Sequence, residues 1–143
     1  MTINVYTDGA CSGNPGIGGW GAVILINKED PIHIHGGSTH TTNNQMELKA
    51  AIEVLKYFPK PEIINVITDS KYVKDGIESW IHNWKKNGWK TATKKTVKNK
   101  ELWVELDEQI TKHAISWKWV KGHSGNKHNE VADYLARRFI EES

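Results

Sequence analysis

The sequence predicts an α/β protein in which a mixed β-sheet carries helices on its faces. Three strand-like segments joined by short connections open the chain, and helical and strand-like segments alternate after them. Short connections suit antiparallel neighbours, whereas a strand that follows a helix can return parallel to an earlier strand. Because a chain of 143 residues can bury a substantial core, we expect residues 1–143 to form a single domain.

The opening strands are expected at residues 2–7, 20–27 and 32–39, the third being the weakest. Between the first two lies DGACSGNPGIGG, residues 8–19, which is rich in glycine. Glycine clusters are typical of turns and loops, so this segment is predicted to be a loop.

The first helix is expected at residues 41–58, where threonine and asparagine can cap its start and the PKP sequence after it ends it. A buried strand, EIINVIT, follows at residues 62–68. Residues 70–86 are predicted to be helical in two pieces, because Gly76 interrupts the pattern.

The last part of the chain repeats the alternation of helix and strand. Residues 88–99 are predicted to be a loop, and residues 100–111 a helix, because apolar residues recur there at helical spacing. A strand is expected at 113–120, where apolar and polar residues alternate. A loop at 121–128 and a helix at 129–142 close the chain.

The composition favours a cytoplasmic protein. The N-terminal MTINVYTDGA has no basic region and no long apolar run, so no signal peptide is expected. The longest apolar run, AVILI at 22–26, is too short to span a bilayer. The single cysteine, Cys11, excludes an intramolecular disulfide and suits a reducing compartment. We expect a monomer without a membrane partner.

Two similar strand ends carry the first candidate site residues. NVYTDG at 4–9 is echoed by NVITDS at 65–70, and each apolar strand ends in Thr-Asp. If the two strands are parallel neighbours, Asp8 and Asp69 emerge at the same sheet edge, where ligands of α/β sheets bind. The simpler alternative is that both aspartates only begin turns.

Glu47 strengthens the case for a site. On a helical wheel it falls in the middle of the apolar arc of its helix, facing the sheet. A carboxylate in that direction is unfavourable unless it is paired or binds a metal. The alternative, an acid favoured by the helix dipole, explains its position along the helix but not its direction.

Converging carboxylates repel one another, and a divalent cation relieves the repulsion. Oxygen ligands without Cys or His at zinc spacing favour Mg²⁺, with Mn²⁺ as an alternative. Together with a basic surface, such a site suggests phosphodiester chemistry with two metal ions.

The basic surface is the lysine-rich segment, residues 85–100, which holds seven of the nineteen basic residues and no acid. Such a run is often only a solvated face, but beside a carboxylate cleft it is better explained by phosphate binding. Among the tryptophans near it, helical spacing predicts that Trp80, Trp84 and Trp103 are core residues. Trp89 is predicted to present an exposed ring.

Several motifs together resemble the bacterial ribonuclease H type 1 family. They are YTDGACSGNPGIGGWGA, TTNNQMEL, TDSKYV, WIHNWKKNGWKTA, WVKGHSG and NEVADYLAR, and they run in the family's order over nearly the whole chain. The resemblance implies an RNase H-like fold, with a five-stranded mixed sheet of order 3-2-1-4-5 flanked by helices. It also implies Mg²⁺-dependent hydrolysis of the RNA strand of RNA–DNA hybrids by two metal ions, leaving 5′-phosphate and 3′-hydroxyl ends.

The resemblance assigns roles residue by residue. The catalytic, metal-binding carboxylates would be Asp8, Glu47, Asp69 and Asp133, and His123 would be a catalytic histidine in a loop. Asp133 lies off the apolar stripe of its helix, where a solvated aspartate would look the same. The expected substrate-binding residues are Cys11, Asn14, Asn43, Asn44, Gln45, Ser70, Lys71, Trp80, Lys85, Lys86, Trp89, Lys94 and Lys95.

Two positions depart from the family pattern: Lys71 stands where glutamine is common, and Gln45 where arginine is common. They leave the expected activity intact but put the pattern of substrate contacts in doubt. There are two alternative functions. A non-catalytic hybrid-binding module would lack a carboxylate, and a DNA-processing nuclease of the same fold would not be expected to carry TTNNQMEL and the lysine-rich segment.

Overall fold

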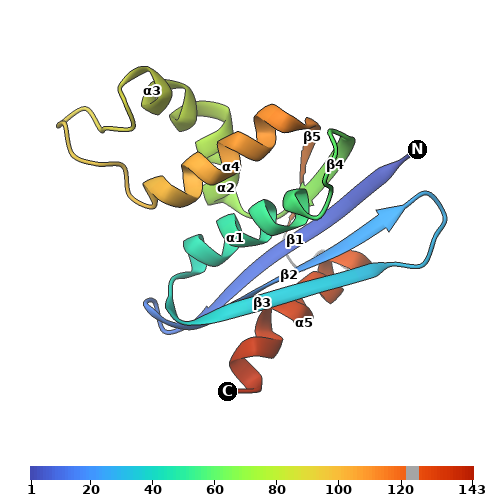
Figure 1. Cartoon of the computed structure of the whole chain (residues 1–143). Helices are drawn as coiled ribbons and strands as arrows, with labels where there is room; N and C mark the ends of the chain where they lie inside the picture. The colour runs from blue at the N-terminus through green and yellow to red at the C-terminus, as the bar shows by residue number, and fades with distance from the viewer. Residues whose placement is uncertain (122–125) are drawn as a thin grey trace.

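The computed structural model describes residues 1–121 and 126–143 and contains a five-stranded sheet of order β3-β2-β1-β4-β5 (Figure 1). The strands are β1 Ile3–Ser12, β2 Gly16–Ile26, β3 Ile32–Thr41, β4 Ile63–Thr68 and β5 Ala114–Trp119. The helices are α1 Asn43–Lys56, α2 Lys71–Asp75, the π-helical turn η1 Gly76–Trp80, α3 Ile81–Lys86, α4 Lys100–Lys112 and α5 Lys127–Glu141. The predicted mixed sheet and its strand order are confirmed.

Strand pairing places the two echoed segments side by side. β1 is antiparallel to β2 and parallel to β4, and Thr7 is the register partner of Thr68. β4 continues the sheet in parallel to β5, and β2 pairs with β3 in antiparallel. Asp8 and Asp69 therefore directly follow the register partners Thr7 and Thr68, as the similarity of the two segments predicts.

The glycine-rich segment 8–19 is mostly strand, so the prediction of a loop there is wrong. β1 runs to Ser12 and β2 begins at Gly16. The glycines make room for α5: a Cβ on Gly19 would lie 2.1 Å from the Ala136 carbonyl oxygen, and one on Gly21 would lie 2.5 Å from the Leu135 Cβ. Here glycine permits close packing of a helix on a strand.

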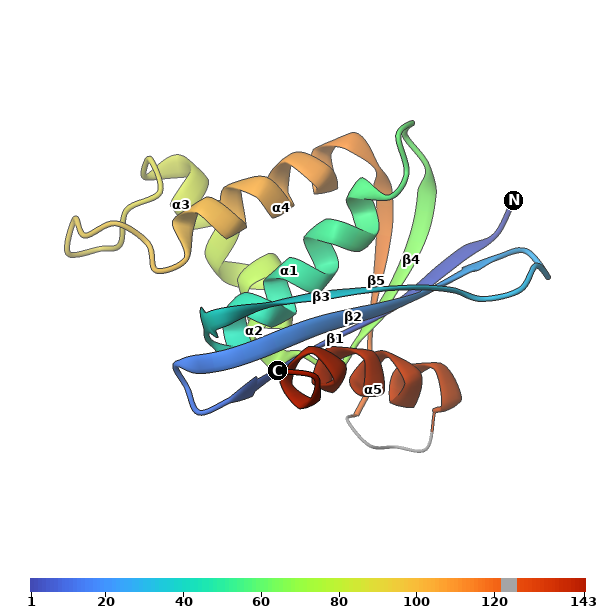
Figure 2. The same ribbon diagram turned by 60° about the horizontal axis from the view of Figure 1, so that its bottom comes forward.

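Helices cover both faces of the sheet (Figure 2). α1 and α4 lie on one face, over a core that includes Leu48, Leu55 and the wholly buried Trp103. α5 lies on the opposite face and packs mainly on β2 and β1. In the described residues no helix is both long and apolar enough to cross a membrane.

Residues 71–86 are helical throughout, and the interruption expected at Gly76 is a π-helical turn. A Cβ on Gly76 would lie 2.0 Å from the Trp103 ring, so only glycine allows the close approach. A π-helical turn holds one extra residue and so rotates the side chains that follow it. This shift explains why Ile81 is buried whereas Trp80 is 37% exposed.

Candidate functional site

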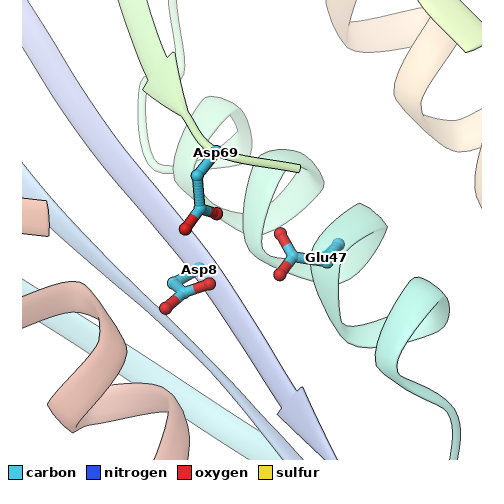
Figure 3. A group of neighbouring side chains, drawn as sticks. All are labelled: Asp8, Glu47 and Asp69. Carbon is cyan, nitrogen blue, oxygen red and sulfur yellow. The ribbon is translucent and has the colours of Figure 1, made fainter. Parts of the chain in front are cut away.

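Three carboxylates from distant parts of the chain meet beside the end of β4, where β1 continues past it (Figure 3). Asp8 lies on β1, Glu47 on α1 and Asp69 directly after β4. One oxygen from each side chain lies within 4.8 Å of the others, close enough to hold a metal ion. The parallel register of β1 and β4 and the direction of Glu47 on its helix produce this cluster.

The backbone fixes the orientation of the two buried carboxylates. The Gly9 N–H lies 2.9 Å from Asp8 Oδ1 and 3.0 Å from Glu47 Oε1, and donates to both. A Cβ on Gly9 would lie 2.5 Å from the Glu47 nitrogen, so glycine lets β1 approach α1. Thr42, one of the predicted capping residues, begins α1 and accepts from the Gln45 N–H.

The cluster carries unfavourable negative charge when no cation is present. Burial and, next, the charge of Asp69 raise the pKa of Asp8 to about 7. Burial and then Asp8 raise the pKa of Glu47 well above its usual range. Glu47 Oε2 is buried and lacks a hydrogen-bond partner within residues 1–121 and 126–143. An oxygen left in this way, among other carboxylates, fits a site for a hard divalent cation.

These shifts predict how stability depends on pH and metal. Because the folded-state pKa of Asp8, about 7, exceeds the ordinary 3.8, folded protein retains protons that unfolded protein releases. Without metal, the free energy of unfolding should therefore fall as pH rises from about 4 to about 7. A divalent cation would bind the deprotonated cluster, so added Mg²⁺ should raise the melting temperature more at about pH 8 than at about pH 5.

Melting curves at both pH values, with Mg²⁺ or with EDTA, check this expectation. The Glu47→Gln variant removes one charge from the cluster, so its metal-dependent rise in melting temperature should be smaller. An equal Mg²⁺ effect at the two pH values, or the same effect in Glu47→Gln, would contradict the metal site.

Asp133 projects from α5 into the same cleft as the other three carboxylates. It contributes to the raised pKa of Asp8, and its Oδ2 accepts from Arg137 Nε at 3.1 Å. Helical periodicity could not find it, because the signal is its position relative to β1, and that depends on how α5 docks. His123 lies outside the described residues.

The cleft has a volume of about 520 Å³ and brings together many of the expected substrate-binding residues. Besides the four carboxylates, its walls include Cys11, Asn43, Asn44, Ser70, Lys71 and Tyr72. Asn14 adjoins it, because its Oδ1 accepts from the Asn43 N–H at 2.9 Å. Gln45 does not line this cleft but contacts Asn99.

The lysine-rich segment extends from the end of α3 and returns to the start of α4 (Figure 1). The side chains of Lys85, Lys86, Lys94 and Lys95 are exposed along it. Lys85 lies 3.3 Å from Asp107, a contact at the surface. These lysines form an accessible basic surface, as the sequence predicts.

Two of the tryptophan predictions are wrong. Trp80, expected in the core, is exposed, because the π-helical turn rotates it outward. Trp89, expected to be exposed, is half-buried. Its backbone N–H donates to the Trp84 carbonyl oxygen at 2.7 Å, and its ring packs against the core. Trp84 is half-buried as well, and Trp103 is fully buried as predicted.

Comparison with known proteins places these features in context. A model of the RNase H family matches residues 1–141. Ribonuclease H of Francisella philomiragia is 58% identical over 140 residues, which cover 98% of this chain and 91% of that protein. The structure of LC9-RNase H1, a type 1 RNase H with the type 2 active-site motif, has a TM-score of 0.86 and 31% identity, covering 99% of this chain and 72% of that one. LC11-RNase H1, solved in complex with RNA/DNA hybrid, shares the fold with a TM-score of 0.72 and 22% identity, covering 99% and 98% of the two chains.

Proposed function

The chain belongs to the ribonuclease H family, and from this premise we propose that it is an endonuclease that hydrolyses the RNA strand of RNA–DNA hybrids. The observation that carries the proposal is the cleft in which Asp8, Glu47 and Asp69 converge and which Asp133 also lines. A module that only binds hybrids has no need of this buried, mutually repelling set of acids.

The four carboxylates would hold divalent cations, with Mg²⁺ preferred and Mn²⁺ able to replace it. When bound, two such ions would supply Lewis-acid stabilisation of the charge that develops at the scissile phosphate. The chain orients the ligands: Gly9 N–H fixes Asp8 and Glu47, and the β1–β4 register fixes Asp8 against Asp69. By the family resemblance the products carry 5′-phosphate and 3′-hydroxyl ends, and His123 assists proton transfer.

Substrate choice would come from the polar wall of the cleft. A hybrid presents 2′-hydroxyls on one strand only, across a minor groove wide enough to be read. Asn43 and Asn44 are exposed at the start of α1, and Cys11 and Ser70 lie on the other walls of the same cleft. These small or amide side chains can contact sugar hydroxyls close to the carboxylates.

The lysine-rich segment would bind the phosphates of the DNA strand. The exposure of its lysines and the lack of acids within it fit a surface for a polyanion. Trp80, exposed at the base of the segment, would contact the same strand. We also propose that the enzyme works in the cytoplasm, because a single cysteine suits a reducing compartment. We propose as well that it is a monomer.

The function is tested by incubating the protein with labelled RNA–DNA hybrid, duplex RNA and duplex DNA, each with Mg²⁺ or with EDTA. Cleavage of the RNA strand of the hybrid alone, and only with Mg²⁺, is the expected result. Cleavage of duplex DNA at a comparable rate would instead indicate a DNA-processing nuclease. Binding of the hybrid without cleavage in any metal would indicate a binding module.

Replacing Lys85, Lys86, Lys94 and Lys95 together by alanine should raise KM and leave kcat nearly unchanged. The reason is that phosphate contacts position a duplex without touching the scissile bond. Each contact that is lost should flatten the slope of log affinity against log salt by up to about one unit. KM measured across a salt series checks this.

The control is Lys28→Ala with Lys60→Ala, two exposed lysines outside the segment. This pair should leave the salt slope unchanged. The same slope in the wild type and the quadruple variant would show that the segment is only a solvated face.

A further inference from the structure

A chain of side-chain hydrogen bonds connects the first helix of the cleft to the lysine-rich segment. The Thr41 hydroxyl donates to Gln45 Oε1 at 2.8 Å, and Gln45 Nε2 donates to Asn99 Oδ1 at 3.1 Å. Asn99 Nδ2 then donates to the Tyr72 hydroxyl oxygen at 3.1 Å. Trp103 Nε1 donates to the same oxygen at 2.9 Å.

The direction of one bond in this chain is fixed by chemistry alone. An indole N–H can only donate, so Tyr72 accepts from Trp103. Gln45 both accepts and donates, which an arginine at this position could not do, because a guanidinium has no acceptor. The departure from the family pattern at Gln45 therefore changes the hydrogen-bond pattern here, because Gln45 accepts from Thr41 and donates to Asn99.

Asn99 is the point where the chain holds the lysine-rich segment. Its backbone is left-handed, with φ of 62°, at the position where the segment turns into α4. The neighbouring Val97 is buried at 3% exposure and anchors the segment through apolar contact. The Asn99 side chain holds the segment as well, because its Oδ1 accepts one hydrogen bond and its Nδ2 donates another.

Tyr72 connects Asn99 to the cleft where the substrate would bind. It lines the cleft that holds the four carboxylates. It also lines an apolar pocket of about 270 Å³ together with Trp80, Trp84 and Val97. The ring of Tyr72 thus lies between the cleft and the base of the lysine-rich segment, and its hydroxyl sets its position relative to both.

We propose that Gln45 and Tyr72 are positioning residues, which act through Asn99 to hold the lysine-rich segment in a fixed orientation relative to the catalytic cleft. The inference rests on the proposed function, in which the segment binds one strand of the duplex while the carboxylates act on the other. Gln45 then affects substrate binding through Asn99. Loss of either residue should loosen the orientation of the bound duplex and leave the carboxylates in place.

A double-mutant cycle tests the proposal with Gln45→Met, Tyr72→Phe and the double variant, all assayed on RNA–DNA hybrid well below their melting temperatures. Each single change should raise KM about fivefold, the effect of losing its one hydrogen bond to Asn99, with kcat within about twofold of wild type. Because both residues act through Asn99, the double variant should be little worse than either single one. A double variant near the product of the two effects, about 25-fold, would overturn the proposal. So would an unchanged KM in Tyr72→Phe.

Gln109→Met is the matched control, since it makes the same change on α4 at a glutamine outside the chain of bonds. It should leave KM unchanged, and an increase equal to that of Gln45→Met would overturn the proposal. If the wild type neither binds nor cleaves the hybrid, the proposed function fails. The connection is then judged from the melting temperatures of the four proteins of the cycle, where non-additive shifts support it and additive shifts overturn it.

Discussion

Replacing Asp69 by asparagine is expected to abolish cleavage while hybrid binding is retained. The carboxylate stands in the three-residue cluster with Asp8 and Glu47, where an amide cannot replace the charge that a divalent cation requires. Loss of several kcal/mol of charge stabilisation would slow the reaction by about a thousandfold or more. Single-turnover cleavage at saturating hybrid measures the rate, and a binding assay with the same hybrid measures affinity.

The same substitution should not destabilise the metal-free protein. The charge of Asp69 raises the pKa of Asp8, so its removal relieves a repulsion within the fold. The melting temperature in EDTA should therefore stay the same or increase. Asp30→Asn, at an exposed turn, is the control and should keep wild-type activity. Activity of Asp69→Asn within about tenfold of wild type would show that the metal site is assigned wrongly.

Replacing Trp103 by alanine is expected to cause the largest loss of stability. Its side chain is 0% exposed, fills the space left by Gly76, and donates to the Tyr72 hydroxyl. Removing so large a buried ring should reduce the free energy of unfolding by about 3–5 kcal/mol. Denaturant unfolding of the wild type and the variant measures the difference.

Trp80→Ala is the matched control for this prediction, because Trp80 is 37% exposed and packs at the surface against Tyr72 and Trp84. Its effect on the free energy of unfolding should be much smaller. If the two variants lost similar stability, burial would not be what distinguishes these tryptophans, and the π-helical turn would not have the effect inferred from it.

The sequence predicts most of the carboxylate cluster because two local signals have a clear spatial meaning. Parallel neighbours that share a sequence in register place the residues that follow it close together, as Asp8 and Asp69 show. A charged residue in an apolar arc must face the sheet, as Glu47 does. The first inference needs only the pairing of two strands, and the second needs only the geometry of one helix.

Other features depend on contacts between elements, and a single sequence does not encode them locally. Only the family resemblance points to Asp133, since its place in the cleft follows from the docking of α5 on β1 and β2. Gly19 and Gly21 look like loop residues until the helix they accommodate is known. Helical spacing places Trp80 wrongly in the core, because the extra residue of a π-helical turn breaks the 3.6-residue spacing.

The packing of α5 also has a consequence for the order in which the enzyme becomes active during synthesis. Among the described elements α5 is made after all the others, yet its partners are β1, β2 and β3, the first three to be made. A nascent chain can form β1, α1 and β4, with Asp8, Glu47 and Asp69, while α5 is still inside the exit tunnel. Asp133 reaches the cleft only after α5 has left the tunnel. Until then, a ribosome-bound chain would carry an incomplete carboxylate set beside the RNA that encodes it.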